Sequence, residues 1–188
     1  RWRISSIEPN LLTDEIIDFV SSSDHFMPHF HIPLQSGNDV LLKSMRRKYD
    51  RDLYRRRVER IKERMPNACI GVDVIVGYPG ETDERFLDSL YFLNELPVSY
   101  LHVFTYSERA NTLAPGMEDA VDMSIRRERS KQLRQLSMQK KTAFYRSQSG
   151  QKRKVLFEAA EDEGWMYGFT DNYVKVRTPF DEQKVNEI

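Results

Sequence analysis

The stretch IGVDVIVGYPGETDERF, from Ile70 to Phe86, decides how this chain folds. It begins as an almost continuous apolar run rich in β-branched residues, which is typical of a strand buried on both faces of a parallel sheet. It then passes through two glycines and a proline, which indicate a tight loop. Thr82 is suited to cap a helix that begins directly after this loop. The stretch therefore predicts a strand, a ligand-sized loop and a helix in immediate succession.

Three further segments have the same strand-like character, and helical patterns separate all four. Thr13 and Asp50 are suited to cap two of these helices, as Thr82 is for the third. The expected strands are Arg3–Ile7, Phe30–Leu34, Ile70–Val76 and Tyr100–Tyr106. Alternating strands and helices favour right-handed crossovers and a parallel sheet. Four strands are too few to close an eight-stranded barrel. We therefore expect an α/β fold whose parallel βα units form a partial, open TIM-like barrel.

The chain changes character near Ser149-Gly150. Before this point, Ser124–Gln148 predicts a long basic helix with an inner face of Ile125, Leu133, Leu136 and Phe144. After it, three runs alternate polar with apolar residues, which predicts strands of a small, incomplete antiparallel β-barrel. These runs are Arg153–Ala159, Trp165–Thr170 and Asn172–Thr178. We expect residues 1–148 and 149–188 to form separate domains.

Composition limits the protein classes to which the chain can belong. Its 29 Lys and Arg balance 29 Asp and Glu, and 39% of its residues are hydrophobic, which is ordinary for a soluble domain. No apolar run approaches the length of a membrane span. Cys69 is the one cysteine, so an internal disulfide or a cysteine-held iron–sulfur cluster is excluded. We expect a cytoplasmic protein, and Arg1 in place of Met predicts that the chain was cut from a longer one.

The zero net charge hides a local excess of positive charge. From Arg126 to Lys154 there are eleven Lys or Arg and one acid, Glu128, a difference of ten. Such a segment is suited to a polyanion such as nucleic acid. A solvated helix face is the alternative interpretation.

Polar residues follow each expected strand, at the end where parallel α/β folds bind ligands. Ser6 and Glu8 follow the first strand, and Gln35 and Ser36 follow the second. Helix capping and turn formation are the alternative roles for such residues. Asp73 lies within an apolar strand, where an unpaired carboxylate is costly. It must face a polar interior, pair with a base, or lie on an exposed register.

The loop after the third strand has its own expected role. Gly77 and Gly80 allow backbone to approach a ligand, because they carry no side chain. Glu81 either holds the turn or accepts hydrogen bonds from ligand hydroxyls. His29 and His31 share one face of a strand at a spacing that suits a metal, but no third ligand is near in sequence, so we predict no metal site.

Four segments together resemble the radical S-adenosylmethionine (SAM) methylthiotransferases. They are HIPLQSGNDVLLKSMRRKY (His31–Tyr49), DVIVGYPGETDERF (Asp73–Phe86), HVFTYSERANTLA (His102–Ala114) and Val155–Val176. The last resembles the first half of a TRAM RNA-binding domain. Phe104–Thr112 is more similar to the branch that acts on N6-threonylcarbamoyladenosine in tRNA than to the isopentenyladenosine branch.

This resemblance implies the cofactors and the partner. In the family, a 4Fe–4S cluster on a CxxxCxxC loop cleaves SAM to a radical that attacks the adenosine beside the anticodon. A second cluster supplies sulfur, and a second SAM supplies the methyl group. Both cysteine sets are absent here. We therefore expect the C-terminal part of the radical SAM partial barrel (1–148) and the N-terminal part of a TRAM domain (149–188), inactive without the clusters, with SAM and tRNA as ligands.

The resemblance also implies roles for individual residues. The expected cofactor-binding residues are Ser6, Glu8, Gln35, Ser36, Asp73, Gly77 and Arg46. The expected RNA-binding residues are Arg109, Arg153, Lys154, Asn172, Tyr173 and Lys175. An exposed helix face is the alternative for Arg46, and a core position is the alternative for Tyr173.

Two alternatives to this function stay open. One is a non-catalytic RNA-binding module built on the basic helix and the partial TRAM domain. The other is a sister enzyme that methylthiolates isopentenyladenosine or a ribosomal protein. The missing barrel strands are also expected to expose an apolar flank, which predicts self-association.

Overall fold

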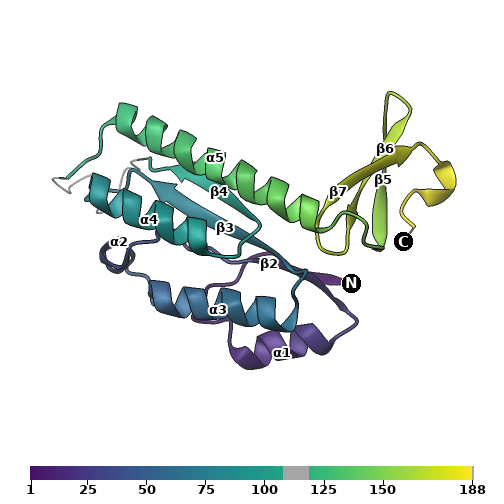
Figure 1. Cartoon of the computed structure of the whole chain (residues 1–188), viewed down its shortest axis with the longest axis horizontal. Helices are drawn as coiled ribbons and strands as arrows, with labels where there is room; N and C mark the ends of the chain where they lie inside the picture. Colours follow the sequence, from purple (N-terminus) through teal and green to yellow (C-terminus); the bar gives the residue numbers. More distant parts are fainter. Residues whose placement is uncertain (108–118, 188) are drawn as a thin grey trace.

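The computed structural model describes residues 1–107 and 119–187, which form two separate β-sheets (Figure 1). The first sheet is parallel, in the order β1-β2-β3-β4. Its strands are β1 (Trp2–Ile4), β2 (Phe26–His31), β3 (Cys69–Val76) and β4 (Tyr100–Thr105). The predicted parallel α/β arrangement of the first part of the chain is confirmed.

The bounds of the first two strands differ from the prediction. β1 ends at Ile4, and its pairing with β2 shifts register between Trp2 and Ile4. β2 begins at Phe26 and ends at His31, before Pro33, which has no N–H for a sheet ladder. Beyond His31 the pairing with β3 continues irregularly, through backbone hydrogen bonds of Ile32 and Leu34 and an isolated bridge between Gln35 and Val74.

Helices begin at the caps that the sequence indicates. They are α1 (Asp14–Ser22), α2 (Asp39–Ser44), α3 (Arg51–Arg64), α4 (Asp83–Glu95) and α5 (Met123–Ser147). The side chains of Thr13, Asp50 and Thr82 accept the backbone N–H groups of Ile16, Leu53 and Arg85. Such bonds satisfy amides that have no partner within their own helix. The predicted starts of α1, α3 and α4 are therefore confirmed.

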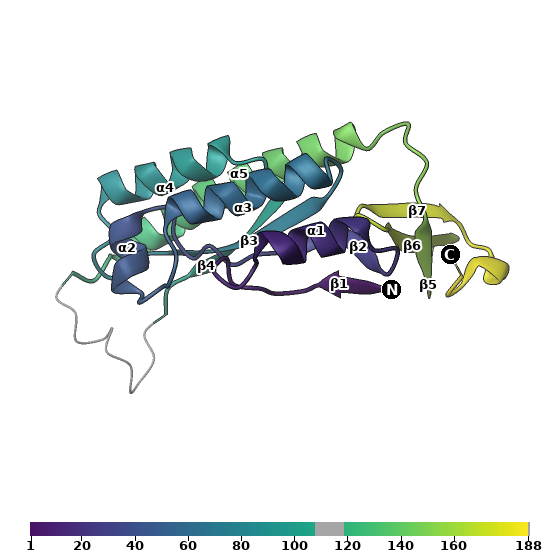
Figure 2. The same cartoon turned by 90° about the horizontal axis from the view of Figure 1, so that it is seen from below.

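The helices lie on one side of the parallel sheet (Figure 2). Alternate strand residues such as Phe30, Ile70 and Val72 are fully buried on that side, in one core with helix residues such as Leu133. Ile125 was predicted to face this core, but it is 42% exposed. The other side of the sheet, here called the open face, carries His29, His31, Asp73, Tyr100 and His102, as the strand alternation requires.

The second sheet is antiparallel, in the order β5-β6-β7. Its strands are β5 (Val155–Asp162), β6 (Trp165–Thr170) and β7 (Lys175–Pro179), and a short helix, η2 (Glu182–Lys184), follows. The last strand was expected from Asn172. That residue lies instead in a turn in which the Thr170 N–H donates to the Val174 carbonyl at 3.0 Å and Tyr173 has a φ of +69°.

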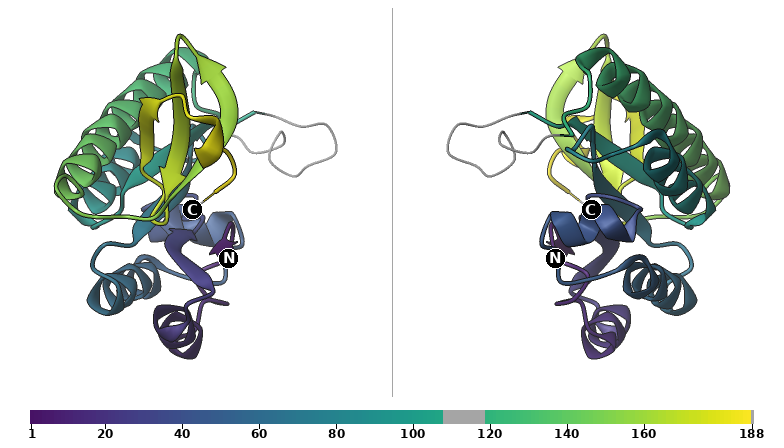
Figure 3. Two further views of the ribbon diagram at one scale, coloured as in Figure 1. Left: turned by 90° about the vertical axis from the view of Figure 1, so that its right-hand side faces the viewer. Right: turned by 90° about the vertical axis from the view of Figure 1, so that its left-hand side faces the viewer.

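The second sheet stands at the end of the parallel sheet where the chain begins, beside the C-terminal half of α5 (Figures 1 and 3). Asn172 Nδ2 donates to the carbonyl of Asn67, just before β3, at 2.9 Å. The β3 and β4 arrowheads point to the opposite end (Figure 1). The expected RNA-binding sheet and the expected cofactor-binding strand ends are therefore at opposite ends of the parallel sheet.

Two surface properties concern the expectations about partners. None of the helices within the described residues combines the length and apolar character needed to cross a bilayer. Trp2 and Phe104, on the two edge strands, are 69% and 52% exposed. Self-association through this surface stays a prediction, which sedimentation can test.

Candidate cofactor and nucleic-acid sites

Three of the expected cofactor-binding residues lie on neighbouring strands, Ser6 and Gln35 beyond the ends of β1 and β2 and Asp73 within β3. Gln35 N–H donates to the Asp73 carbonyl at 2.8 Å, and Ile75 N–H donates to the Gln35 carbonyl at 2.8 Å. On the other side of β2, Ile7 N–H, next to Ser6, donates to the His31 carbonyl at 3.1 Å. Gln35 has a φ of +71°, which is uncommon outside glycine and marks local strain. The backbone thus places Gln35 beside Asp73, and Ser6 on the other side of β2 near the level of His31.

Asp73 pairs with a base, which was one of its three predicted alternatives. Its Oδ1 lies 2.8 Å from His31 Nε2, on the open face of the sheet. The His102 ring is next to that of His31, with 5.3 Å between centroids. Burial, and then the neighbouring His31, lower the pKa of His102. The pair is partly accessible, since the side chains of His31 and Asp73 are 14% and 22% exposed.

The loop after β3 is held by a buried ion pair. Gly77 N–H donates to Glu81 Oε2 at 2.7 Å, and Arg129 of α5 donates to the same oxygen at 2.8 Å. Burial raises the pKa of Glu81, against the lowering effects of Gly77 and Arg129. Arg129 also donates to Asp83 at 2.7 Å. Of the two predicted roles of Glu81, the structure shows the one that holds the turn.

Gly77 is required by a contact within the protein. Its φ of +76° favours glycine, and a Cβ at this position would overlap the side chain of Arg126. The expectation that this glycine makes room for a ligand is wrong, because the space is filled by α5.

The other expected cofactor-binding residues take different places. Ser36 is 2% exposed, and its hydroxyl bonds with Ser89 at 3.3 Å and accepts the Asn38 N–H at 3.2 Å. The expectation of a ligand contact from Ser36 is therefore wrong, because burial closes its side chain off. Glu8 pairs with Arg47 at 3.0 Å. Arg46 is exposed, but it lies in the turn after α2, with a φ of +55°, and not on the helix face of its alternative interpretation.

Asn172, an expected RNA contact, is completely buried. Its amide nitrogen donates to the Asn67 carbonyl at 2.9 Å and to Gln148 Oε1 at 2.8 Å, and its oxygen accepts the Thr170 hydroxyl at 2.7 Å. The RNA assignment of Asn172 is wrong, because it connects the second sheet to the first. No simple sequence signal distinguishes such a buried asparagine from an exposed turn residue.

The remaining expected RNA contacts differ in exposure. Lys154 and Lys175 are exposed. Arg153 donates to Gln148 at 3.0 Å and lies 3.6 Å from Asp171, so part of its charge is neutralised. Tyr173 packs on His29, with 4.5 Å between ring centroids, and on Phe169 at 4.8 Å. Arg109 lies outside the described residues.

Part of the basic segment is used inside the protein. Arg126 and Arg129 are buried, and Lys140 donates to the carbonyls of Asn94 and Leu96 at the end of α4 at 3.0 and 2.7 Å. Burial lowers the pKa of Lys140 to about 8. The exposed cations that are left are Arg127, Lys131, Arg134, Lys141, Arg146, Lys152 and Lys154. The positive surface is therefore weaker than the sequence count predicts.

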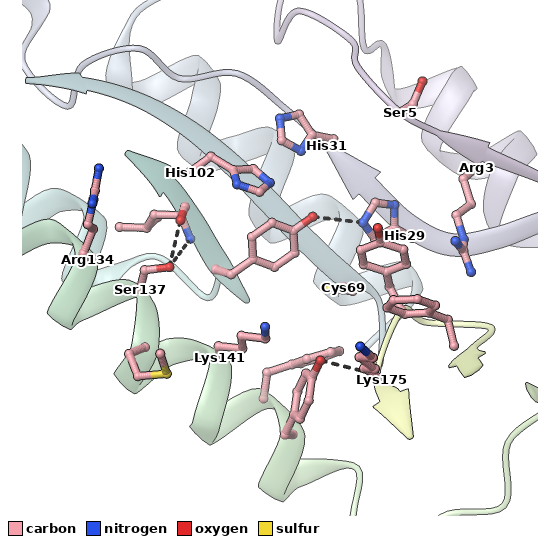
Figure 4. A pocket seen from close by; sticks show the side chains of 17 residues that line it. Arg3, Ser5, His29, His31, Cys69, His102, Arg134, Ser137, Lys141 and Lys175 are labelled. Atoms are coloured by element: carbon pink, nitrogen blue, oxygen red, sulfur yellow. Dashed lines mark hydrogen bonds between the residues drawn. The ribbon is translucent and has the colours of Figure 1, made fainter. Parts of the chain in front are cut away.

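A cavity that the sequence did not predict lies between the open face, α5 and the second sheet (Figure 4). This junction cavity has a volume of about 780 Å³. His29, His31 and His102 reach it from the parallel sheet, Lys141 from α5 and Lys175 from β7. His29 is 5% exposed, and its Nε2 lies 3.2 Å from the Tyr100 hydroxyl. Burial, and then the charge of Arg3, lower the pKa of His29 to about 4.

Comparison with known proteins connects these features to a family. Residues 2–93 match the Radical SAM superfamily. The whole chain is 40% identical to the threonylcarbamoyladenosine tRNA methylthiotransferase MtaB of Bacillus subtilis and covers 43% of that protein. The chain is a relative of the tRNA methylthiotransferases of the radical SAM superfamily.

Two further comparisons support this relationship. A tRNA-2-methylthio-N(6)-dimethylallyladenosine synthase of Staphylococcus aureus is 36% identical over 91% of the chain, which covers 34% of that methylthiotransferase. The chain thus spans less than half the length of these curated relatives. The Escherichia coli radical SAM enzyme HemN, coproporphyrinogen III oxidase, matches 76% of the chain with a TM-score of 0.51 and 18% identity, which shows a shared fold only.

Methylthiotransferases of this superfamily use SAM and 4Fe–4S clusters. The residues of this chain do not fit a cluster, because Cys69 is the one cysteine in the sequence and is 2% exposed. Burial also raises the pKa of its thiol to about 11, away from the thiolate that binds metals. The polar strand ends fit SAM better, since the side chains of Ser6 and Gln35 form no hydrogen bonds within residues 1–107 and 119–187.

Proposed function

We propose that the chain is part of a methylthiotransferase that modifies N6-threonylcarbamoyladenosine next to the anticodon of tRNA. The observation that carries this proposal is the 40% identity to MtaB over the full chain, which exceeds the 36% over 91% for the dimethylallyladenosine enzyme. The open face and polar strand ends supply a surface for a nucleoside-bearing cofactor. Because the substrate is a tRNA, we place the activity in the cytoplasm.

We further propose that residues 1–148 are the C-terminal part of a partial TIM-like barrel and residues 149–188 the first part of a TRAM domain. The four parallel strands and the separate antiparallel sheet support this division. SAM, when bound with its cluster, supplies the radical chemistry. This chain's share is to bind and orient it, with Ser6 and Gln35 as hydrogen-bonding groups and Asp73, oriented by His31, as an acceptor for a hydroxyl or an amine.

The test is the nucleoside content of tRNA in cells. Deleting the gene should remove the methylthio group from threonylcarbamoyladenosine, as measured by liquid chromatography and mass spectrometry. Full-length wild-type gene should restore it, and Asp73→Asn should restore much less, because it weakens the bond with His31 and removes an anionic acceptor. Asp52→Asn, an exposed acid on α3, is the matched control and should restore it fully.

Each alternative predicts a different result of the same deletion. Loss of the methylthio group from isopentenyladenosine, or from a ribosomal protein, would replace our substrate by that of a sister enzyme. No change in any methylthio group would leave a non-catalytic RNA-binding module. Such a module should bind tRNA with an affinity that falls steeply with salt, as phosphate contacts require.

The proposed dependence on clusters has its own test. The 188 residues treated with iron and sulfide should develop no stable cluster absorbance and should not cleave SAM, because only Cys69 is present. A stable cluster with SAM cleavage would contradict this part of the proposal.

A further inference from the structure

We propose that Arg126 is a positioning residue for methylthio transfer, because it holds together the strand ends at which the target base of tRNA must meet the cofactor. The inference rests on the proposed function, and it concerns a side chain apart from the proposed SAM contacts Ser6, Gln35 and Asp73. Arg126 is in the first turn of α5, which lies at the end of the sheet to which β3 and β4 point (Figure 1).

Arg126 joins the two chain segments on either side of the connection between β4 and α5. Its Nη1 donates to the carbonyl of Tyr106, just after β4, at 3.0 Å. Its Nε donates to the carbonyl of Val121, just before α5, at 2.7 Å. The planar guanidinium can form both bonds at once, because its N–H groups point in different directions. One side chain therefore fixes the end of β4 against the start of α5.

The same side chain also meets the loop after β3. A Cβ at Gly77 would overlap the aliphatic part of Arg126. The guanidinium lies 5.4 Å from the centroid of the Tyr106 ring. That ring packs edge-to-face on the ring of Tyr78, in the loop after β3, with 5.5 Å between centroids. The loop after β3, the end of β4 and the start of α5 therefore all meet at Arg126.

Burial makes this arrangement specific to arginine. Arg126 is 3% exposed, and a buried charge is costly unless hydrogen bonds satisfy it. A lysine carries one ammonium group on a flexible stem, so it cannot reproduce two bonds that diverge from a planar group. Arg126→Lys should therefore loosen the strand ends while it keeps the positive charge.

The place of these contacts predicts which step depends on them. Parallel α/β folds bind their ligands at the C-terminal ends of the strands. The proposed SAM contacts come from the first three strands and the residues that follow them, whereas Arg126 acts on the loop after β3 and on the end of β4. Loss of Arg126 should therefore leave SAM in place and disturb the fit of the tRNA base. A misplacement of about 1 Å can lower a rate about a hundredfold.

The experiment compares two reactions of the full-length gene product loaded with clusters, namely SAM cleavage without tRNA and methylthio transfer to tRNA. Arg126→Lys should lower the rate of transfer about a hundredfold and leave the rate of SAM cleavage unchanged. Arg127→Lys makes the same change at the exposed neighbouring position and should alter neither rate. Parallel losses of both rates in Arg126→Lys would indicate general damage to the fold and overturn the inference, as would an unchanged rate of transfer.

Hydrogen exchange provides a readout that does not depend on activity. Gly80 N–H donates to the Asp119 carbonyl at 2.9 Å, between the loop after β3 and the chain before α5. Exchange of the Gly80 amide in the 188-residue chain should become faster in Arg126→Lys and stay unchanged in Arg127→Lys. Unchanged exchange in Arg126→Lys would contradict the proposed positioning. If thermal unfolding shows that Arg126→Lys does not fold, Arg126→Gln, which keeps a single amide donor, replaces it with the same expected results.

The wild-type protein separates a failure of this inference from a failure of the proposed function. Transfer by the wild type, with an unchanged rate in Arg126→Lys, would remove the inference alone. No transfer by the wild type would remove the proposed function, and the affinity for tRNA would then decide the inference. Arg126→Lys should bind tRNA about tenfold more weakly than the wild type, and Arg127→Lys should bind it equally well. Equal affinity of all three proteins would overturn the inference.

Discussion

At the scale of single residues, buried polar groups determine how each end of the parallel sheet is built. Glu81, with Arg129, closes the loop at the C-terminal end of β3. His29, with Tyr100 and Tyr173, lies at the other end, beside the second sheet. The side chains of Glu81 and His29 are each 95% buried, so the ionisation of each is linked to folding.

His29 makes a prediction about stability and pH. Its folded pKa of about 4 lies below the usual 6.5, so the unfolded chain binds the extra proton first as pH falls. Stability should therefore decrease between pH 7 and pH 5, by about 2 kcal/mol from this group alone. Urea unfolding of the chain at the two pH values measures the decrease.

His29→Phe supplies the control for this prediction. Between pH 7 and pH 5 the free energy of unfolding of this variant should fall by about 2 kcal/mol less than that of the wild type. The reason is that the imidazole that takes up a proton in the unfolded state is gone. His25→Phe changes an exposed histidine and should keep the wild-type loss. An unchanged loss in His29→Phe would show that the acid sensitivity has another source.

At the scale of elements, local signals were predicted well and contacts between distant elements were not. Thr13, Asp50 and Thr82 cap their helices as predicted, because a cap depends on an amide only three residues ahead. The neighbour of Gly77 could not be predicted, because Arg126 reaches it from a helix far along the chain. The sequence shows a glycine at position 77, but it does not show that the side chain of Arg126 fills the space beside it.

Gly77→Ala tests this contact between the loop and α5. The substitution should destabilise the chain by more than about 2 kcal/mol, because it adds an overlap with Arg126 to the strain of a positive φ. Gly164→Ala is the matched control, with a φ of +81° and open space around the added methyl. Gly164→Ala should lower the free energy of unfolding only by the cost of a positive φ at alanine, about 1–2 kcal/mol. Equal losses in urea unfolding would mean that Arg126 moves aside freely.

At the scale of the whole molecule, the two sheets are joined by a small polar and aromatic contact. Asn172 bonds to Asn67 and Gln148, and Lys175 N–H donates to the Tyr145 hydroxyl at 3.1 Å. The sequence predicted both sheets, the first from apolar runs separated by helical patterns and the second from its alternation of polar and apolar residues. It could not predict their joint or the cavity beside it, since both depend on how separate units pack. For this reason the sequence analysis predicts RNA contacts for Asn172 and Tyr173, whereas in the structure both side chains contact other residues of the protein.

Asn172→Ala tests this joint. Loss of the amide takes the Asn172 donor from the Asn67 carbonyl and leaves the Gln148 oxygen with Arg153 alone, so the free energy of unfolding should fall by about 2 kcal/mol. Amide hydrogen exchange in β6 and β7 should become faster, because the second sheet is less firmly held. Asn94→Ala, at an exposed position of α4, should change neither quantity. Unchanged exchange in Asn172→Ala would show that the aromatic contacts hold the sheets together alone.

The most direct test of the central claim uses purified full-length gene product, loaded with clusters and incubated with SAM, a reductant and tRNA from the deletion strain. We predict that 5′-deoxyadenosine and methylthiolated threonylcarbamoyladenosine appear together and that Asp73→Asn reduces both. Tight binding of the tRNA with neither product formed would contradict the account and leave a protein that binds RNA without modifying it.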